Sequence, residues 1–232
     1  FKLLFQILVE IDIIKKVEKG KVRSMIKNID NISINCQSSI KISDGLTIYF
    51  DPYDIKEKVN NADYIFITHP HWDHLDIDSI NNIANEKTII VGPSSVIEKL
   101  NKTFNLLEVE PNKTYNLDNI TFKTVPSYNI GRDYHPKEAL YVGYLLTLND
   151  IAYYIPGDTD VIEELKELNA DVIFLPVGGT YTMNREEAVE IANTIKPKYA
   201  IPIHYGLAIG SREDAKYFVD NLNKEINSKI FY

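Results

Sequence analysis

Nine consecutive residues, 68–76, hold three of the five histidines of the 232-residue chain and two of its aspartates. His69 and His71 are two residues apart, so in an extended segment both side chains face the same side. Asp73 and His74 follow them through a turn. Imidazole nitrogens and carboxylate oxygens suit zinc, and four such groups exceed what one open tetrahedral site needs once ligands from elsewhere join. The spacing therefore predicts a site for two metal ions.

The histidine cluster begins where a buried strand is expected to end. Residues 62–69, ADYIFITH, form a short apolar run rich in aromatic and β-branched side chains, which is typical of a strand buried on both faces. Four other polar stretches also follow predicted strands directly, namely residues 127–129, 157–160, 178–184 and 204–206. Because site residues of layered α/β folds gather in loops at one end of the strands, we expect these loops to converge on one cleft.

The order of elements predicts the fold. Asp44-Gly45 indicates a hairpin between two early strands, and strands and helices then alternate as far as a helix entered at Ser94 or Ser95. Residues 105–157 read as strands of a second, mostly antiparallel sheet. Alternation resumes with a helix near 160–168, a helix opened by Asn184 and a last helix opened by Ser211. This pattern predicts an α/β fold in which two mixed sheets are sandwiched between helices, an αββα four-layer arrangement.

Composition indicates a folded protein with one main domain over residues 31–232. Residues 1–30 are expected to form a helical extension, because apolar side chains recur there at helical spacing; the stretch is too short and too charged to span a membrane. The net charge of −8 disfavours nucleic acid as a partner. The single cysteine allows no intrachain disulfide and fits the cytoplasm. No oligomeric state is indicated.

The motif His69-Pro70-His71-Trp72-Asp73-His74, with GDTD at 157–160 and a late strand ending in His204, closely resembles the metallo-β-lactamase superfamily of binuclear metallohydrolases. The resemblance runs from about residue 31 to the last helix. The stretches VPSYN, YHPK, LPVGGTYTMN and IPIHYG look like the branch that contains ascorbate-6-phosphate lactonase and related zinc-dependent hydrolases. The αββα fold of the superfamily agrees with the layering predicted from the pattern of elements.

The resemblance implies a set of metal ligands. His69 and His71 would bind the first metal, Asp73, His74 and His204 the second, and Asp158 would bridge both. Taken alone, Asp158 would be read as a cap of the following helix and His204 as a buried core histidine. Two zinc ions per chain are expected, although this ligand set also accommodates Mn²⁺ or Fe²⁺.

One ligand of the first metal departs from the superfamily pattern. Many relatives carry a third histidine where this chain has Asn129, and asparagine is the weaker metal ligand. His135 is the fifth histidine, so either it reaches the metal from a longer loop or the first site is weak. Asp51 matches a position whose carboxylate holds a ligating histidine from beneath, although an Asp-Pro turn at a strand end is an equally good interpretation.

The resemblance implies a metal-dependent hydrolase that attacks a small ester, lactone or amide with a water activated between the two metals. Asp73, His74 and Asp158 are the expected catalytic residues, with Asp73 or a second water passing a proton to the leaving group. Arg132 and Lys137 are candidates for holding an anionic substrate group, although each alone reads as solvated surface charge. The alternatives are a metal-dependent phosphodiesterase and a non-catalytic binding module that keeps the fold and one metal.

Overall fold

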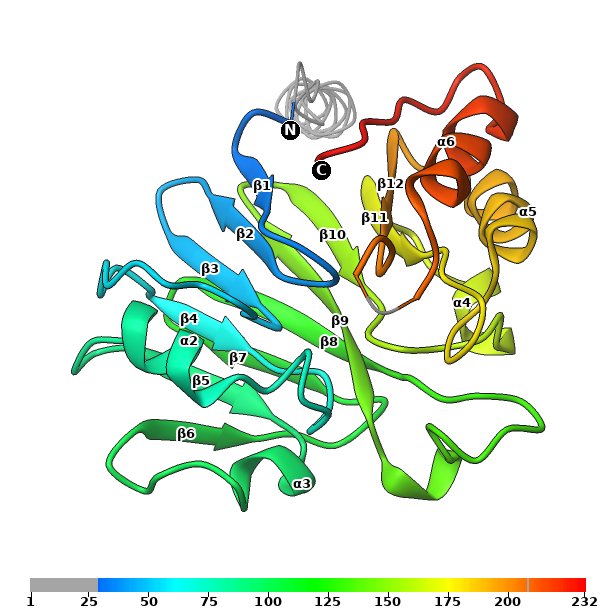
Figure 1. Ribbon diagram of the computed structural model, residues 1–232. Coiled ribbons are helices and arrows are strands. Elements are labelled where there is room, and N and C mark those ends of the chain that lie inside the picture. The colour runs from blue at the N-terminus through cyan, green and yellow to red at the C-terminus, as the bar shows by residue number, and fades with distance from the viewer. Residues whose placement is uncertain (1–28, 208) are drawn as a thin grey trace, which may run out of the picture.

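The computed structural model describes residues 29–207 and 209–232, in which two six-stranded sheets face each other (Figure 1). The expected helix within residues 1–30 lies almost entirely outside the described residues. The first sheet has the order β1-β2-β3-β4-β5-β6 and the second the order β12-β11-β10-β9-β8-β7. Among the described residues, no helix is long and apolar enough to cross a membrane.

The first sheet changes from antiparallel to parallel pairing after β3. Its strands are β1 (Ile32–Ile34), β2 (Ile40–Ser43), β3 (Thr47–Phe50), β4 (Tyr64–Phe66), β5 (Ile89–Gly92) and β6 (Asn105–Glu108). The β2–β3 hairpin turns at Asp44-Gly45, as the sequence predicts, with Ser43 opposite Thr47. β3, β4, β5 and β6 run parallel to their neighbours.

The prediction for residues 105–108 was wrong in one respect. The sequence placed this strand in the second sheet, whereas β6 is the edge strand of the first sheet and pairs in parallel with β5. A parallel pair needs a crossover connection, and the segment containing the short helix α3 (Ser94–Ile97) supplies it. The antiparallel sheet therefore starts one strand later than expected, at β7.

The second sheet is antiparallel from β7 to β10 and parallel from β10 to β12. Its strands are β7 (Thr114–Leu117), β8 (Ile120–Pro126), β9 (Val142–Leu148), β10 (Ile151–Ile155), β11 (Val172–Pro176) and β12 (Tyr199–Ile203). A 3₁₀ turn, η1 (Lys137–Ala139), lies in the connection between β8 and β9. Two mixed sheets, as predicted, thus make up the centre of the fold.

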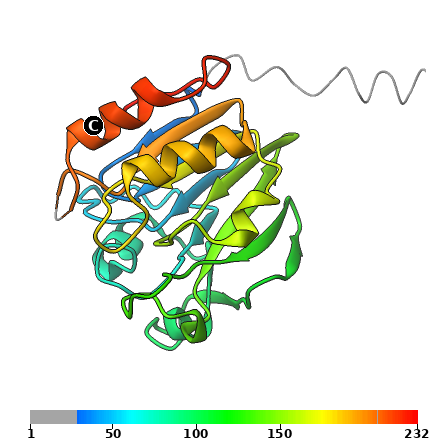
Figure 2. The same cartoon turned by 90° about the vertical axis from the view of Figure 1, so that its right-hand side faces the viewer.

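Helices form the two outer layers, which confirms the predicted αββα arrangement. On the first sheet lie α2 (Ile77–Ile83) and α3, and on the second lie α4 (Glu163–Lys166), α5 (Arg185–Ile195) and α6 (Arg212–Asn221) (Figures 1 and 2). Asn184 and Ser211 open α5 and α6 with capping boxes, in which the cap and the third helical residue bond to each other's backbone N–H. The helix expected at 160–168 is only the short α4.

Three apolar clusters hold the four layers together. Between the sheets pack Phe50, Phe66, Phe122 and Tyr144, with ring centroids 4.9 to 6.3 Å apart. A second cluster joins the first sheet to α2 and α3, and a third joins the second sheet to α4, α5 and α6. Burial of apolar surface in these three clusters stabilises both sheets. The loops at the strand ends are therefore attached to rigid strands.

Candidate metal centre

Four strand ends deliver the clustered polar side chains to one place. His69, His71, Asp73 and His74 follow β4, and the N–H groups of His74 and Leu75 both donate to the carbonyl of His71, at 3.1 and 2.8 Å, which makes the turn compact. His135 lies in the long loop after β8, Asp158 follows β10 and His204 follows β12. The convergence expected from the loop positions is therefore present.

Gly157 allows the loop that carries Asp158 to approach the loop of the histidine cluster. Its φ of +67° is in the left-handed region, and a Cβ atom there would lie 2.9 Å from Cβ of Thr68 and 3.2 Å from Oγ of Ser127. Any larger residue would push Asp158 away from the cluster. Asp158 does not cap α4, whose N-cap residue is Ile162.

The first group of ligand atoms consists of three imidazole nitrogens. Nδ1 of His71 lies 3.1 Å from Nε2 of His69 and 3.1 Å from Nε2 of His135. His69 and His135 are buried, and His71 is partly exposed. A cation placed among these three atoms would have the imidazole environment that zinc, iron and manganese accept.

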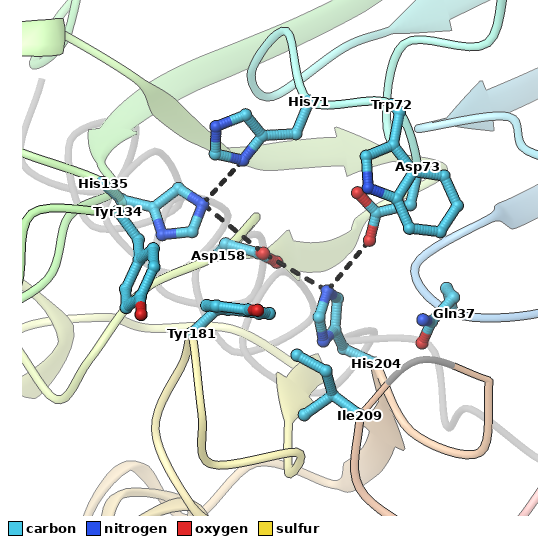
Figure 3. A pocket seen from close by; sticks show the side chains of 10 residues that line it. All are labelled: Gln37, His71, Trp72, Asp73, Tyr134, His135, Asp158, Tyr181, His204 and Ile209. Carbon is cyan, nitrogen blue, oxygen red and sulfur yellow. Dashed lines mark hydrogen bonds and ion pairs between the residues drawn. The ribbon is translucent and has the colours of Figure 1, made fainter.

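The second group consists of Asp73, His74 and His204, and Asp158 lies between the two groups. Oδ2 of Asp73 is 3.3 Å from Nε2 of His204 and 3.6 Å from Nε2 of His74. Oδ2 of Asp158 is 3.2 Å from Nε2 of His204 and 3.5 Å from Nε2 of His135, so one oxygen faces both groups (Figure 3). Its other oxygen is 3.3 Å from Nε2 of His74.

Apart from the ion-pair contacts of 3.2 to 3.6 Å given above, three of these buried atoms make no hydrogen bond within the described residues: Nε2 of His74, Nε2 of His204 and Oδ1 of Asp158. Buried polar atoms are normally paired, because an unpaired one loses its hydration without compensation. All three face the centre of the cluster, where a divalent cation would satisfy them together. The donor set and the unpaired atoms therefore both fit metal binding.

The charges of the cluster differ between its two halves. Burial lowers the pKa of His135 to about 4 and also lowers the pKa of His69 and His71, so these imidazoles are neutral and ready to bind a metal. Burial would also lower the pKa of His204, but the carboxylates of Asp158 and Asp73 raise it to about 9. The second group therefore holds a proton at neutral pH that a metal must displace.

Asp51 supports one histidine of each group. Its Oδ2 accepts from Nδ1 of His74 at 2.8 Å and from the hydroxyl of Thr68 at 2.7 Å, and its Oδ1 accepts from the backbone N–H of Thr68 at 2.8 Å. The Thr68 hydroxyl lies 3.0 Å from Nδ1 of His69, which is thereby placed to donate to it. Hydrogen bonds to the far nitrogen fix the ring and leave Nε2 free for a metal. Thr68 was not singled out from the sequence, although it directly precedes the motif.

Asn129 lies behind His135 and does not join the ligand atoms. Its Oδ1 is 2.9 Å from Nδ1 of His135, and its Nδ2 donates to Oδ1 of Asp160 at 3.1 Å and to the carbonyl of Tyr181 at 2.9 Å. The two donor contacts orient the amide so that its oxygen faces the imidazole. Of the two alternatives left open by the sequence, the geometry favours the one in which His135 reaches the first group from the longer loop.

The two cations expected at the substrate lie outside the cavity. The guanidinium of Arg132 pairs with Asp160 and donates to three carbonyls, those of Gly179, Thr180 and Thr182. It therefore ties the loop before His135 to the loop before α5. Lys137 lies over the ring of Tyr128 and pairs with Glu164 at 3.6 Å. Neither residue is among those that line the cavity.

A cavity of about 260 Å³ opens onto the cluster. Its wall includes the ligand candidates His71, Asp73, His135, Asp158 and His204, and five residues that were not singled out from the sequence, namely Gln37, Trp72, Tyr134, Tyr181 and Ile209 (Figure 3). Sequence reasoning had no signal for most of these side chains, because the five residues come from five separate loops. The volume suits a compact ligand.

The chain is similar to a family of known proteins over most of its length. A model of the "Beta-lactamase superfamily domain" family matches residues 33–204. A UPF0173 protein of Pyrococcus abyssi is 32% identical over 171 residues, which are 70% of this chain and 76% of that protein. A UPF0173 metal-dependent hydrolase of Carboxydothermus hydrogenoformans is 28% identical over 178 residues, 70% of this chain and 78% of that one.

A solved structure with the same fold comes from Parabacteroides distasonis, where the protein is named as a proposed metal-dependent hydrolase. It is 30% identical in sequence and superposes with a TM-score of 0.73 over 86% of this chain and 91% of the other. This likeness confirms the fold expected from the motif and from the order of elements.

Proposed function

Because the chain belongs to the metallo-β-lactamase superfamily and to its UPF0173 family, we propose that it is a metal-dependent hydrolase with a binuclear centre. The observation that carries the proposal is the position of Asp158. Its Oδ2 lies 3.5 Å from His135 of the first group and 3.2 Å from His204 of the second. A carboxylate shared in this way suits two adjacent metal ions and has no evident use with one.

His69, His71 and His135 would hold the first metal, and Asp73, His74 and His204 the second, with Asp158 between them. Two metals bound there would acidify a water and polarise the bond under attack, so no serine or cysteine nucleophile is needed. Zinc is the metal we propose, and this ligand set would also accept Mn²⁺ or Fe²⁺.

The side chains of the site have separate tasks. Asp51 and Thr68 hold the rings of His74 and His69, and Asn129 holds the ring of His135. Asp73 lines the cavity beside His204, so its carboxylate can carry a proton toward the leaving group. Burial raises the pKa of Asp73, but contacts with His204 and His74 outweigh that effect and keep the carboxylate ionised at neutral pH.

The substrate class we propose is a small ester, lactone or amide. Lactones are included because of the resemblance to ascorbate-6-phosphate lactonase, and that branch remains a prediction. A phosphodiester substrate is less favoured, because no lysine or arginine is among the described residues that line the cavity. A non-catalytic module that keeps one metal is less favoured too, because three imidazoles, and not Asn129, meet at the first group. The cytoplasmic location also remains a prediction.

Metal analysis joined to a substrate panel tests the proposal. We expect purified protein to bind two equivalents of zinc and to hydrolyse members of a panel of lactones, esters and thioesters. Activity should disappear with a chelator and return with zinc. Protein that binds no zinc, manganese or iron, or whose hydrolysis is indifferent to chelation, would contradict the proposal.

A further inference from the structure

Gln37 lies in the turn between β1 and β2, and its side chain borders the cavity. The residue is 0% exposed and lines the cavity together with Asp73 and His204. In the view of Figure 3 it is drawn on the same side as Trp72, with Tyr134 and Tyr181 on the opposite side. A polar side chain from a distant part of the chain therefore forms part of the wall next to the second metal group.

Neither end of the Gln37 amide has a hydrogen-bond partner within the described residues. Both Nε2 and Oε1 are buried and unpaired. An amide without partners loses its hydration and gains nothing in return, so a buried amide that remains unpaired is uncommon. A molecule that enters the cavity with a matching donor and acceptor would satisfy both atoms.

Hydrogen bonds to its backbone carbonyl hold Gln37 next to His204, a member of the second group. Its carbonyl accepts from the backbone N–H of His204 at 3.1 Å and from the hydroxyl of Tyr232 at 3.0 Å. Its φ of +48° lies in the left-handed region, which residues with a Cβ atom rarely adopt. Strained backbone of this kind persists only where surrounding contacts impose it, and it is concentrated at functional sites. These contacts fix the backbone of Gln37 relative to His204, so the side chain starts from a defined position beside the second group.

The rest of the wall indicates which groups the cavity accepts. Among the described residues that line it there is no lysine or arginine, so away from the groups of ligand atoms an anionic substituent would find no cationic side chain. Aromatic rings border it: Trp72 is 59% exposed, and Tyr134 and Tyr181 stand edge to face with their centroids 4.6 Å apart. Such rings favour contact with an uncharged, partly apolar molecule.

Resting on the proposed hydrolase function, we infer that Gln37 determines substrate specificity by pairing its amide with a carboxamide-like group of the substrate. A primary or cyclic carboxamide offers both the acceptor that Nε2 requires and the donor that Oε1 requires. The substrate class is thus a compact ester or lactone that bears such a neutral group, and the aromatic rings contact its apolar part. Gln37 takes no part in the bond cleavage itself.

A pair of nearly isosteric esters tests the inference by kinetics. Methyl succinamate carries a terminal carboxamide, and methyl levulinate replaces the amide nitrogen with a methyl group. We expect the zinc-loaded protein to prefer methyl succinamate about ten- to a hundredfold in kcat/KM, because the other ester leaves Oε1 of Gln37 unpaired. The same comparison with methyl malonamate and methyl acetoacetate covers a shorter spacing. Equal kcat/KM values at both spacings would overturn the inference.

The variant Gln37→Met keeps the length of the side chain and removes both polar atoms. We expect the ratio of kcat/KM for methyl succinamate to kcat/KM for methyl levulinate to fall to about one. The zinc content and the thermal unfolding of the variant should not change. Ser38→Ala is the matched control: the Ser38 hydroxyl is also buried in the same turn and has no partner among the described residues, but it does not line the cavity. Its preference should equal that of the unchanged protein.

If Gln37 instead had a structural role, the Gln37→Met variant would behave differently. Nδ1 of His204 is also buried and has no hydrogen-bond partner in the part of the chain that the structure describes, so the amide could orient that ring in place of a substrate. In that case Gln37→Met would lose zinc from the second group and would slow both esters equally. Either result would overturn the inference.

A binding measurement separates this inference from the proposed function. Saturation-transfer NMR with butanamide and with pentan-2-one, neither of them an ester, should show contact for butanamide that Gln37→Met abolishes. If no ester or lactone is hydrolysed but this discrimination persists, the hydrolase proposal fails and the assignment of Gln37 stands. If the esters are hydrolysed without discrimination and butanamide does not bind, the assignment fails and the hydrolase proposal stands.

Discussion

Oδ1 of Asn129 lies 2.9 Å from Nδ1 of His135, so the asparagine that stands where the sequence resemblance implies a ligating histidine contacts a histidine six residues further on. The backbone repeats the contact, because the N–H of Asn129 donates to the carbonyl of His135 at 2.8 Å. The loop between them is thereby closed on itself, and Nε2 of His135 is left facing His71. In the proposed centre, His135 would therefore bind the first metal from the long loop after β8.

Replacing Asn129 with alanine should weaken the binding of the first metal and leave the binding of the second unchanged. The ring of His135 would lose the acceptor that fixes it, and loss of such a partner typically costs about 10- to 100-fold in metal affinity. Competition with a chromophoric chelator measures the two zinc affinities. Asn116→Ala, in the hairpin of β7 and β8, is the control and should change neither affinity. Equal weakening of both metals would contradict this role.

Replacing Thr68 with valine should also weaken the binding of the first metal more than the binding of the second. The hydroxyl of Thr68 links Nδ1 of His69 to Asp51, whereas His74 contacts Asp51 directly. Thr68→Ser keeps the hydroxyl and should keep both affinities, while Asp51→Asn should weaken both. Zinc titration of the three variants distinguishes them, and a Thr68→Val protein with two unchanged affinities would show that the hydroxyl does not support the ligand.

Arg132 should prove to hold two loops together and not to bind the substrate. It pairs with Asp160 and donates to the carbonyls of Gly179, Thr180 and Thr182. Arg132→Ala should therefore loosen the loop before His135 and lower the occupancy of the first metal. Arg132→Lys should not restore it, because an ammonium lacks the planar fork that reaches several acceptors. Lys137→Ala is the control. If Arg132→Ala instead raised KM for anionic substrates alone and left zinc bound, Arg132 would be a substrate anchor.

Zinc binding should release protons at neutral pH. Although burial favours the neutral imidazole, Asp158 and Asp51 raise the pKa of His74 well above its ordinary value, and Asp158 and Asp73 raise that of His204 to about 9. Both rings therefore carry protons at neutral pH, and the metal must displace them. Apparent zinc affinity should rise with pH at least until about 9, where His204 loses its proton without the metal. Calorimetry in two buffers of different ionisation enthalpy counts the released protons, and a count of zero at pH 7 would contradict these charges.

Local signals in the sequence predicted much of the fold. The Asp44-Gly45 hairpin and the capping boxes at Asn184 and Ser211 each depend on residues a few positions apart, and the structure has all three. The sheet to which residues 105–108 belong was predicted wrongly, because an isolated short strand carries no local mark of the partner it pairs with. Pairing is decided by the crossover that precedes the strand.

Some residues of the site were also predicted from the sequence, and others were not. The crowded stretch 68–76 indicates metal chemistry by itself, since its side chains lie on one turn. Gln37 and Thr68 gave no such signal, because their roles arise only when loops from distant strands meet. The choice between Asn129 and His135 also needed the folded loop, in which the amide faces the imidazole.

Anomalous diffraction from crystals of the zinc-loaded protein tests the central claim most directly. The account predicts two zinc peaks per chain, separated by roughly 3.5 to 4 Å as in other two-metal sites. One should be bound by His69, His71 and His135, the other by Asp73, His74 and His204, with Asp158 touching both. A single peak, or a first peak bound by Asn129 in place of His135, would contradict it.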